Sequence, residues 1–215
     1  MSKIKTKDQL QNSLDKDFAW RLKEIANLKI AVRTSENLSK KTVVRAAIPL
    51  LYGHWEGFIK KASTYYLEYV NGQSLPYNEL KSCFIVFGVK KKINDLVSSK
   101  NSAVSISTLD FLRGELNQRA NLKIESAIRT EFNLSSKVFE NIASSIGINT
   151  ASYESRYHLI DESLLNRRNH IAHGEYLDID TEGFRGLADE ILNLLRTYKT
   201  DIENSVSLER YKISA

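Results

Sequence analysis

The chain has 215 residues, 42% of them hydrophobic and 27% charged, with two prolines and nine glycines. This composition excludes a mainly disordered chain, and the single cysteine, Cys83, excludes a disulfide scaffold. No run of about 18 uncharged apolar residues is present, and the first residues lack the apolar core of a signal peptide. We therefore expect one domain over residues 1–215, located in the cytoplasm, with no membrane association, no metal and no cofactor.

Charge is distributed unevenly along the chain. Residues 1–100 contain 18 Lys and Arg against 9 Asp and Glu, whereas residues 101–215 contain 13 against 17. A basic half on a compact domain favours a polyanionic partner, nucleic acid above all. The alternative is a solvated, lysine-rich surface that serves solubility.

The spacing of apolar residues is helical nearly throughout. It predicts helices over 6–33, 39–70, 77–97, near 109–116, over 137–146 and 162–173, and from 180 or 181 onward, with a loop over 101–107 and an irregular piece over 122–132. Pro49 should kink the second helix, and the apolar run around Trp55 indicates that this helix is central and buried. The expected fold class is all-α.

Residues that commonly begin or end helices support these limits. Ser135 and Asp161 are predicted N-caps, because their side-chain oxygens can accept from the first free N–H groups of a helix. Gly147 and Gly174 are predicted helix stops, and Asp180 or Thr181 is predicted to begin the last helix.

The densest polar cluster lies at residues 166–175. Asn169 and His173 are four residues apart and share one helix face, whereas Arg168 lies about 140° away from His173. The long side chain of Arg168 reaches the same place if the helix ends or bends between them. Histidine transfers protons near neutral pH and arginine holds phosphate oxygens, a combination that suits phosphoryl chemistry without a metal. The alternative is a polar helix end with capping histidines.

A second polar pair, His54 and Glu56, lies in the apolar run of the central helix. Buried carboxylates and imidazoles require partners, and Arg168 is a candidate partner for Glu56. The alternative is that both side chains face solvent. Three basic groups are candidates for phosphate contacts or for solvated helix faces: Lys40-Lys41 with Arg45, Lys60-Lys61, and Lys90-Lys91-Lys92.

The stretch 168–173 resembles the Arg-x4-6-His motif of the HEPN superfamily, helical domains of defence and toxin systems. Arg168 matches the motif arginine, Asn169 the polar residue that commonly follows it, and His173 the motif histidine. More narrowly, the chain resembles the MAE-type HEPN nucleases of bacteria in three stretches: 51–59, 133–138 and 167–175.

The resemblance implies a bundle of four core helices with additional helices, and a homodimer in which the two motifs face each other. It also implies a metal-independent ribonuclease that acts as a toxin or antiviral effector. Some HEPN domains instead bind nucleotides or RNA without cleaving them.

The favoured hypothesis is an endoribonuclease in which a ribose 2′-hydroxyl attacks the adjacent phosphorus. His173 would act as general acid or base, Arg168 would stabilise transition-state charge, and Asn169 would orient His173 or the phosphate. The candidates for supporting residues are Glu56, His170 and Arg167. The candidates for RNA contacts are Lys40, Lys41, Arg45, Lys60 and Lys61. The alternative is a non-catalytic RNA-binding or partner-binding module, and a cognate antitoxin or defence protein is an expected partner in either case.

Overall fold

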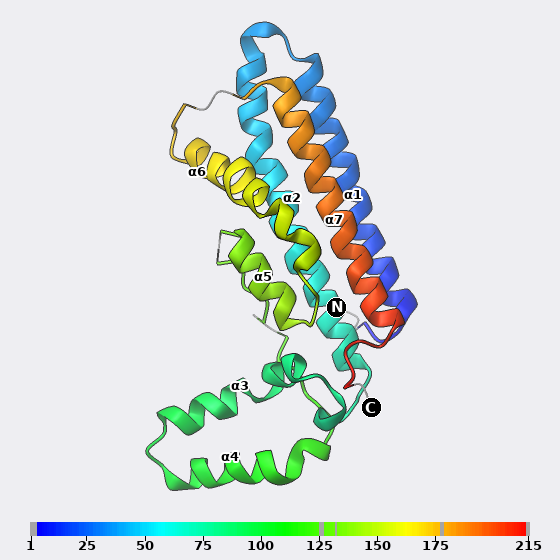
Figure 1. The fold of residues 1–215 in the computed structure, drawn as a ribbon, viewed down its shortest axis with the longest axis vertical. Coiled ribbons are helices and arrows are strands. Elements are labelled where there is room, and N and C mark those ends of the chain that lie inside the picture. Colours follow the sequence, from blue (N-terminus) through cyan, green and yellow to red (C-terminus); the bar gives the residue numbers. More distant parts are fainter. Residues whose placement is uncertain (1–3, 125–126, 132, 177–178, 214–215) are drawn as a thin grey trace.

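The computed structural model describes residues 4–124, 127–131, 133–176 and 179–213. Its α-helices in chain order are α1 (Lys7–Thr34), α2 (Asn37–Gly72), α3 (Ser82–Ser98), α4 (Ser102–Gly114), α5 (Ser136–Ser145), α6 (Arg167–Ala172) and α7 (Thr181–Ser207) (Figure 1). No strand occurs within the described ranges, so the predicted all-α class is confirmed.

The long helices α1, α2 and α7 run side by side, and α5 and α6 pack against α2 (Figure 1). Trp55 of α2 is fully buried, and its ring centroid lies 5.2 Å from that of Phe139 on α5. Phe139 in turn contacts Tyr198 of α7 at 5.6 Å. The prediction that the helix around Trp55 forms the centre of the fold is confirmed.

Side-chain caps explain where α1 and α7 begin. Thr6 accepts from the backbone N–H of Gln9, and the Gln9 side chain accepts from the Thr6 N–H, which forms a capping box at the start of α1. Asp180 caps α7 by accepting from the Gly183 N–H at 2.7 Å. Pro49 lies inside α2, which continues past it as one helix to Gly72.

The predicted helix over 77–97 is wrong in its first part. A 3₁₀ turn spans Tyr77–Glu79, Leu80 is extended, and α3 begins only at Ser82. The Lys81 N–H donates to the backbone oxygen of Tyr211 at 2.9 Å, a bond to the C-terminal segment that requires an interruption of the helix.

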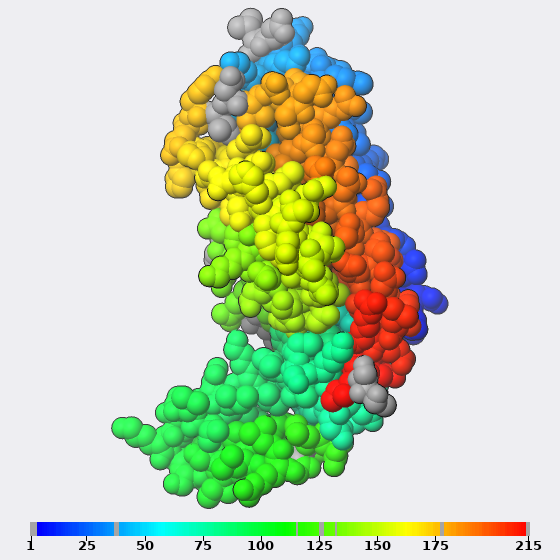
Figure 2. Space-filling view, in the orientation of Figure 1, coloured from blue at the N-terminus to red at the C-terminus, as the bar shows by residue number. Residues whose placement is uncertain are grey.

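The predicted loop over 101–107 is also wrong, because α4 begins at Ser102. The Asn101 side chain accepts from the Ala103 N–H at 2.9 Å, and Thr108 and Phe111 are buried. Helices α3 and α4 form a hairpin that projects from the end of the bundle (Figures 1 and 2). Packing within this hairpin therefore outweighs the loop tendency of the serine-rich stretch.

Asp161 is not the N-cap of its own helical segment, contrary to the prediction. Its carboxylate accepts from the backbone N–H of Ser136 at 2.7 Å and from the Ser136 hydroxyl at 2.6 Å, and so it binds the start of α5. Ser135 caps α5 as predicted, by accepting from the Val138 N–H. Gly147 follows the end of α5 with a φ of +72°, a conformation that favours glycine.

Across the described parts of the chain, no helix combines the length and the apolar character that crossing a lipid bilayer requires.

Candidate functional site

Three segments that are distant in sequence meet at Arg168. The Arg168 guanidinium carbon lies 4.2 Å from the centre of the Tyr52 ring, on α2. Its Nη2 donates to the side-chain oxygen of Asn133, at 2.8 Å, in the segment before α5. The backbone N–H of Leu134 donates to the Tyr52 hydroxyl at 2.6 Å. These residues belong to the three stretches that carry the family resemblance, and the fold brings all three together.

Tyr52 is a fixed, uncharged surface for Arg168. It is buried, and burial raises the pKa of its hydroxyl, an effect that the hydrogen bond from Leu134 opposes. The ring therefore remains a neutral phenol at physiological pH, and its face attracts the guanidinium. Because Arg168 is itself only partly buried, the contact helps to fix a cation that still reaches the surface.

The helix that carries the motif is irregular. Leu159–Asn166 form a π-helix anchored in the core by Ile160 and Leu164, and α6 continues from it at Arg167. Short π-helical turns are rare and occur frequently at functional sites. The predicted regular helix over 162–173 ends at the right place, but the helical stretch begins before residue 162 and its first part is π-helical.

His173 lies where helical geometry ends. It follows the last residue of α6, and Gly174 has a φ of +78°, which turns the chain out of the helix as predicted. The His173 side chain is exposed and makes no hydrogen bond or ion pair to a described residue. It is thus open to a molecule that approaches from solvent.

His170 has a different environment. Its Nδ1 contacts the Glu175 carboxylate, and the Glu175 N–H donates to the His170 backbone oxygen at 2.9 Å. Arg45 of α2 donates to the backbone oxygen of Glu175 at 2.8 Å. The segment that follows the motif is therefore held against both α6 and α2.

The structure separates the basic residues that the sequence grouped as RNA contacts. Lys41 donates to the Tyr176 hydroxyl at 3.1 Å, so Lys41 and Arg45 both reach the segment after His173. Lys61 instead pairs with Asp17 of α1 at 3.1 Å, and Lys60 is exposed. Lys61 lies nine residues after Tyr52, about 180° round the helix axis, which explains the separation.

The expected pairing of Glu56 with Arg168 is not among the contacts of the described residues. Glu56 is half-buried and makes no hydrogen bond or ion pair within that part of the chain; its charge raises the pKa of Tyr52. Asn169 contributes its backbone oxygen, which accepts from the His173 N–H at 3.0 Å. Arg167 is half-buried beside it.

Chemical reasoning on single residues missed Tyr52 and Asn133 as partners of Arg168. Tyr52 lies in the apolar run of the central helix, and Asn133 lies two residues before the Ser135 cap of α5, so residue type alone indicates no role for either at Arg168. The sequence did offer one signal for this site, the presence of the three family-like stretches 51–59, 133–138 and 167–175 in one chain. Segments that together characterise a family commonly meet in its fold.

A separate charged network joins α1 to the other side of α2. Asp17 and Arg21 are both buried, with Nε and carboxylate 2.8 Å apart, and Arg21 also donates to the backbone oxygen of His54. Gly57 gives the guanidinium room, since a Cβ there would lie 3.0 Å from its nitrogens. Burial opposes ionisation of Asp17, but the hydrogen bond and charge of Arg21 outweigh it and lower the Asp17 pKa. We assign this network to helix packing.

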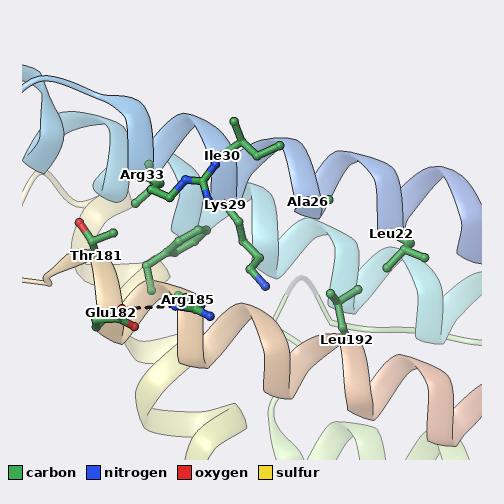
Figure 3. Close-up of a pocket in the computed structure, with 11 residues that line it drawn as sticks. Leu22, Ala26, Lys29, Ile30, Arg33, Thr181, Glu182, Arg185 and Leu192 are labelled. Atoms are coloured by element: carbon green, nitrogen blue, oxygen red, sulfur yellow. Dashed lines mark hydrogen bonds and ion pairs between the residues drawn. The ribbon is translucent and has the colours of Figure 1, made fainter.

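A hollow of about 460 Å³ lies between α1 and α7, away from the motif (Figure 3). Leu22, Ala26 and Ile30 of α1 form much of its wall, and Arg185 pairs with Glu182 at one end. None of the predicted site residues lines it. In the described ranges, no three His, Cys, Asp or Glu side chains form a group that could hold a metal ion.

The all-α bundle, with an Arg-x4-His segment packed on its central helix, has the architecture that the HEPN resemblance implies. The sequence model described as RiboL-PSP-HEPN matches residues 16–204, and the chain therefore belongs to this HEPN family. Membership supports a HEPN nuclease or RNA-binding module in general terms, and the narrower likeness to the MAE type stays a prediction. Comparison with curated proteins and with solved structures gave no match.

Proposed function

We propose that the protein is a metal-independent endoribonuclease of the HEPN type. The observation that carries this proposal is that a positioned arginine in a short helix is followed by an accessible histidine directly after the end of that helix. Tyr52 and Asn133 fix the Arg168 guanidinium, and His173 stands exposed five residues later. Family membership and the basic residues on the adjacent face of α2 support it.

The reaction transfers a phosphoryl group within the RNA. A base removes the proton of a ribose 2′-hydroxyl, the 2′-oxygen bonds to the adjacent phosphorus, and the bond from phosphorus to the 5′-oxygen breaks. An acid protonates the departing 5′-oxygen, which leaves a 2′,3′-cyclic phosphate and a 5′-hydroxyl. His173 serves as the acid or the base, a role that typically contributes about 10²- to 10⁴-fold.

Arg168 stabilises the charge that gathers on the phosphate oxygens in the transition state. A planar guanidinium suits this role because its N–H groups match the spacing of phosphate oxygens. The contact with Tyr52 and the hydrogen bond to Asn133 fix the guanidinium before substrate arrives, so little reorganisation is needed during the reaction. Asn169 helps to place His173 through the bond between its backbone oxygen and the His173 N–H.

The test is cleavage of single-stranded RNA in the presence of EDTA. Wild-type protein should cleave, and Arg168→Ala and His173→Ala should each lose about 10²-fold or more in rate while they still bind RNA. Lys100→Ala is the control, because Lys100 is exposed between α3 and α4, outside the site. Binding without cleavage by the wild type would favour the alternative, a non-catalytic RNA-binding module.

We further propose that the ribonuclease acts as a toxin or antiviral effector that a partner protein restrains. Induction of the wild-type chain in a bacterial host should then arrest growth, and induction of the His173→Ala form at equal level should not. Equal growth of the two cultures would remove the support for a toxic role.

A further inference from the structure

Tyr176 presents an aromatic ring to solvent directly after the motif. The residue is 72% exposed, although large aromatic side chains usually bury most of their area. In Figure 2 the segment after the motif helix, drawn in yellow-orange, forms part of the outer surface. An exposed ring of this kind is suited to contact with another flat molecule.

The ring is held in place from α2. Lys41 Nζ lies 3.1 Å from the Tyr176 hydroxyl and 5.8 Å from the ring centre. The 5.8 Å from Nζ to the ring centre nearly equals the 3.1 Å from Nζ to the hydroxyl oxygen plus the distance from that oxygen to the ring centre, so the three points lie almost on one line. Lys41 therefore lies beyond the hydroxyl, roughly in the ring plane, and covers neither face of the ring. Arg45 fixes the preceding residue by its bond to the Glu175 backbone oxygen.

The ring is near the reacting group. Tyr176 is three positions after His173, so their backbones lie within about 11 Å of each other even if the chain is fully extended. Gly174 turns the chain and the bonds to α2 draw it back toward the bundle. A nucleotide whose phosphate contacts His173 thus has a neighbour within reach of the ring.

We propose that Tyr176 is a binding subsite for an unstacked nucleobase next to the cleaved phosphate. Aromatic rings bind bases of single-stranded RNA in this way, with little dependence on base identity. Lys41 and Arg45 lie beside the ring, where they favour the flanking phosphates. The proposal rests on the ribonuclease function and adds that the substrate is unpaired at the cut, because a base within a duplex cannot reach the ring.

A hollow next to Lys41 extends this surface. Its volume is about 530 Å³, and Lys40, Lys41 and Val44 of α2 line it together with Ile179, Asp180, Thr181 and Glu182 at the start of α7. The same Lys41 side chain thus contacts Tyr176 and borders the hollow. The carboxylates of Asp180 and Glu182 oppose RNA in the hollow itself, so we expect RNA that leaves the ring to follow the Lys40 and Lys41 edge of α2.

Substitution of Tyr176 tests the subsite by its effect on kcat/KM for a single-stranded RNA. Tyr176→Ala should lower kcat/KM by about 5- to 150-fold, the effect of losing one stacked base. Tyr176→Phe should retain most of the activity because it keeps the ring. Tyr176→Leu should behave like the alanine variant. The matched control is Ile106→Ala, which removes a similarly exposed apolar side chain from the projecting hairpin and should leave kcat/KM unchanged.

An abasic substrate separates stacking from a structural role. Removal of the base next to the cut should reduce wild-type cleavage about as much as Tyr176→Ala does, and should reduce cleavage by Tyr176→Ala little further. If the two losses multiply, or if Tyr176→Ala cleaves within about twofold of wild type, the subsite does not exist.

A binding measurement distinguishes failure of this proposal from failure of the ribonuclease proposal. A short single-stranded RNA with 2-aminopurine at its centre is titrated with His173→Ala protein, with and without Tyr176→Ala. Stacking on Tyr176 should quench the fluorescence, and the double variant should not quench it. Quenching without any wild-type cleavage would retain the subsite and reject the ribonuclease. Absence of Tyr176-dependent quenching would overturn the subsite.

Discussion

At the scale of single residues, the site depends on what surrounds Arg168. Tyr52 and Asn133, which contact it, belong to two other segments of the chain. The position of the guanidinium therefore depends on how these three segments pack together. A substitution of Tyr52 should therefore act on the reaction through Arg168, although Tyr52 itself need not touch RNA. Tyr52 is a positioning residue in this account.

The two histidines of the motif should differ in their effect on cleavage. The His173 side chain is exposed and makes no hydrogen bond or ion pair with a described residue, whereas His170 contacts the Glu175 carboxylate. We expect His173→Ala to lower the cleavage rate by about 10²-fold or more and His170→Ala to lower it far less. Single-turnover rates on one RNA measure both. A larger loss in His170→Ala, with both proteins folded, would reverse the assignment.

At the scale of elements, the network between α1 and α2 should make stability depend on pH. His54 is buried, and burial lowers its pKa; Arg21 adds to this, whereas Glu24, 3.3 Å away, and Asp17 oppose it. The unfolded chain has the ordinary histidine pKa of about 6.5 and therefore binds more protons than the folded chain below that pH. The free energy of unfolding should then fall as the pH falls.

Urea denaturation of wild type and His54→Gln at about pH 7.5 and about pH 5.5 measures this effect. The wild type should lose more stability on acidification than the variant, because the variant has no imidazole to protonate. A wild type that gains stability relative to His54→Gln at the lower pH would show that pairing with Glu24 outweighs burial.

Several element boundaries were predictable because one side chain sets each of them locally. The Ser135 cap and the Gly147 and Gly174 stops depend on oxygens and backbone angles within a few residues, so the sequence alone indicates them. Asp161 was misassigned because its true partner, the start of α5, is 25 residues away. The helical start of α4 was missed because burial of Thr108 and Phe111, not local propensity, determines it.

In the candidate site, too, the features set by nearby residues were predictable and those set by distant residues were not. Arg168 and His173 could be named from a motif, and the turn at Gly174 from its residue type. The contacts of Arg168 with Tyr52 and Asn133, and of Arg45 with Glu175, cross more than 30 residues each and depend on how the helices pack. Spacing within one segment carries no information on such contacts.

At the scale of the whole molecule, α2 organises the site. Arg45 and Tyr52 are seven residues apart and share a face, which contacts the motif segment, while the opposite face contacts α1. Helices α1 and α7 fix α2 along its length (Figure 1). Arg168 and His173 thus lie within and directly after a short helix that the bundle supports.

Of the two motif histidines, His170 contacts the Glu175 carboxylate, which leaves His173 as the histidine open to substrate, whereas the proposed reaction needs both a base and an acid. We therefore expect a homodimer in which His173 of each copy serves one role. Light scattering at micromolar concentration should give about twice the 24.5 kDa mass of the chain. Addition of excess His173→Ala protein should lower wild-type cleavage by forming mixed dimers. A 24.5 kDa species that cleaves RNA at full rate would contradict the shared site.

The central claim is that the ribose 2′-hydroxyl attacks the phosphate that Arg168 and His173 contact. The most direct measurement compares a single-stranded RNA with the same RNA that carries one 2′-deoxyribose at the cut position. We predict that wild-type protein binds both equally, releases a 2′,3′-cyclic phosphate and a 5′-hydroxyl from the first, and leaves the second uncut at that position. Cleavage at the deoxyribose, or products that carry a 5′-phosphate, would contradict the account.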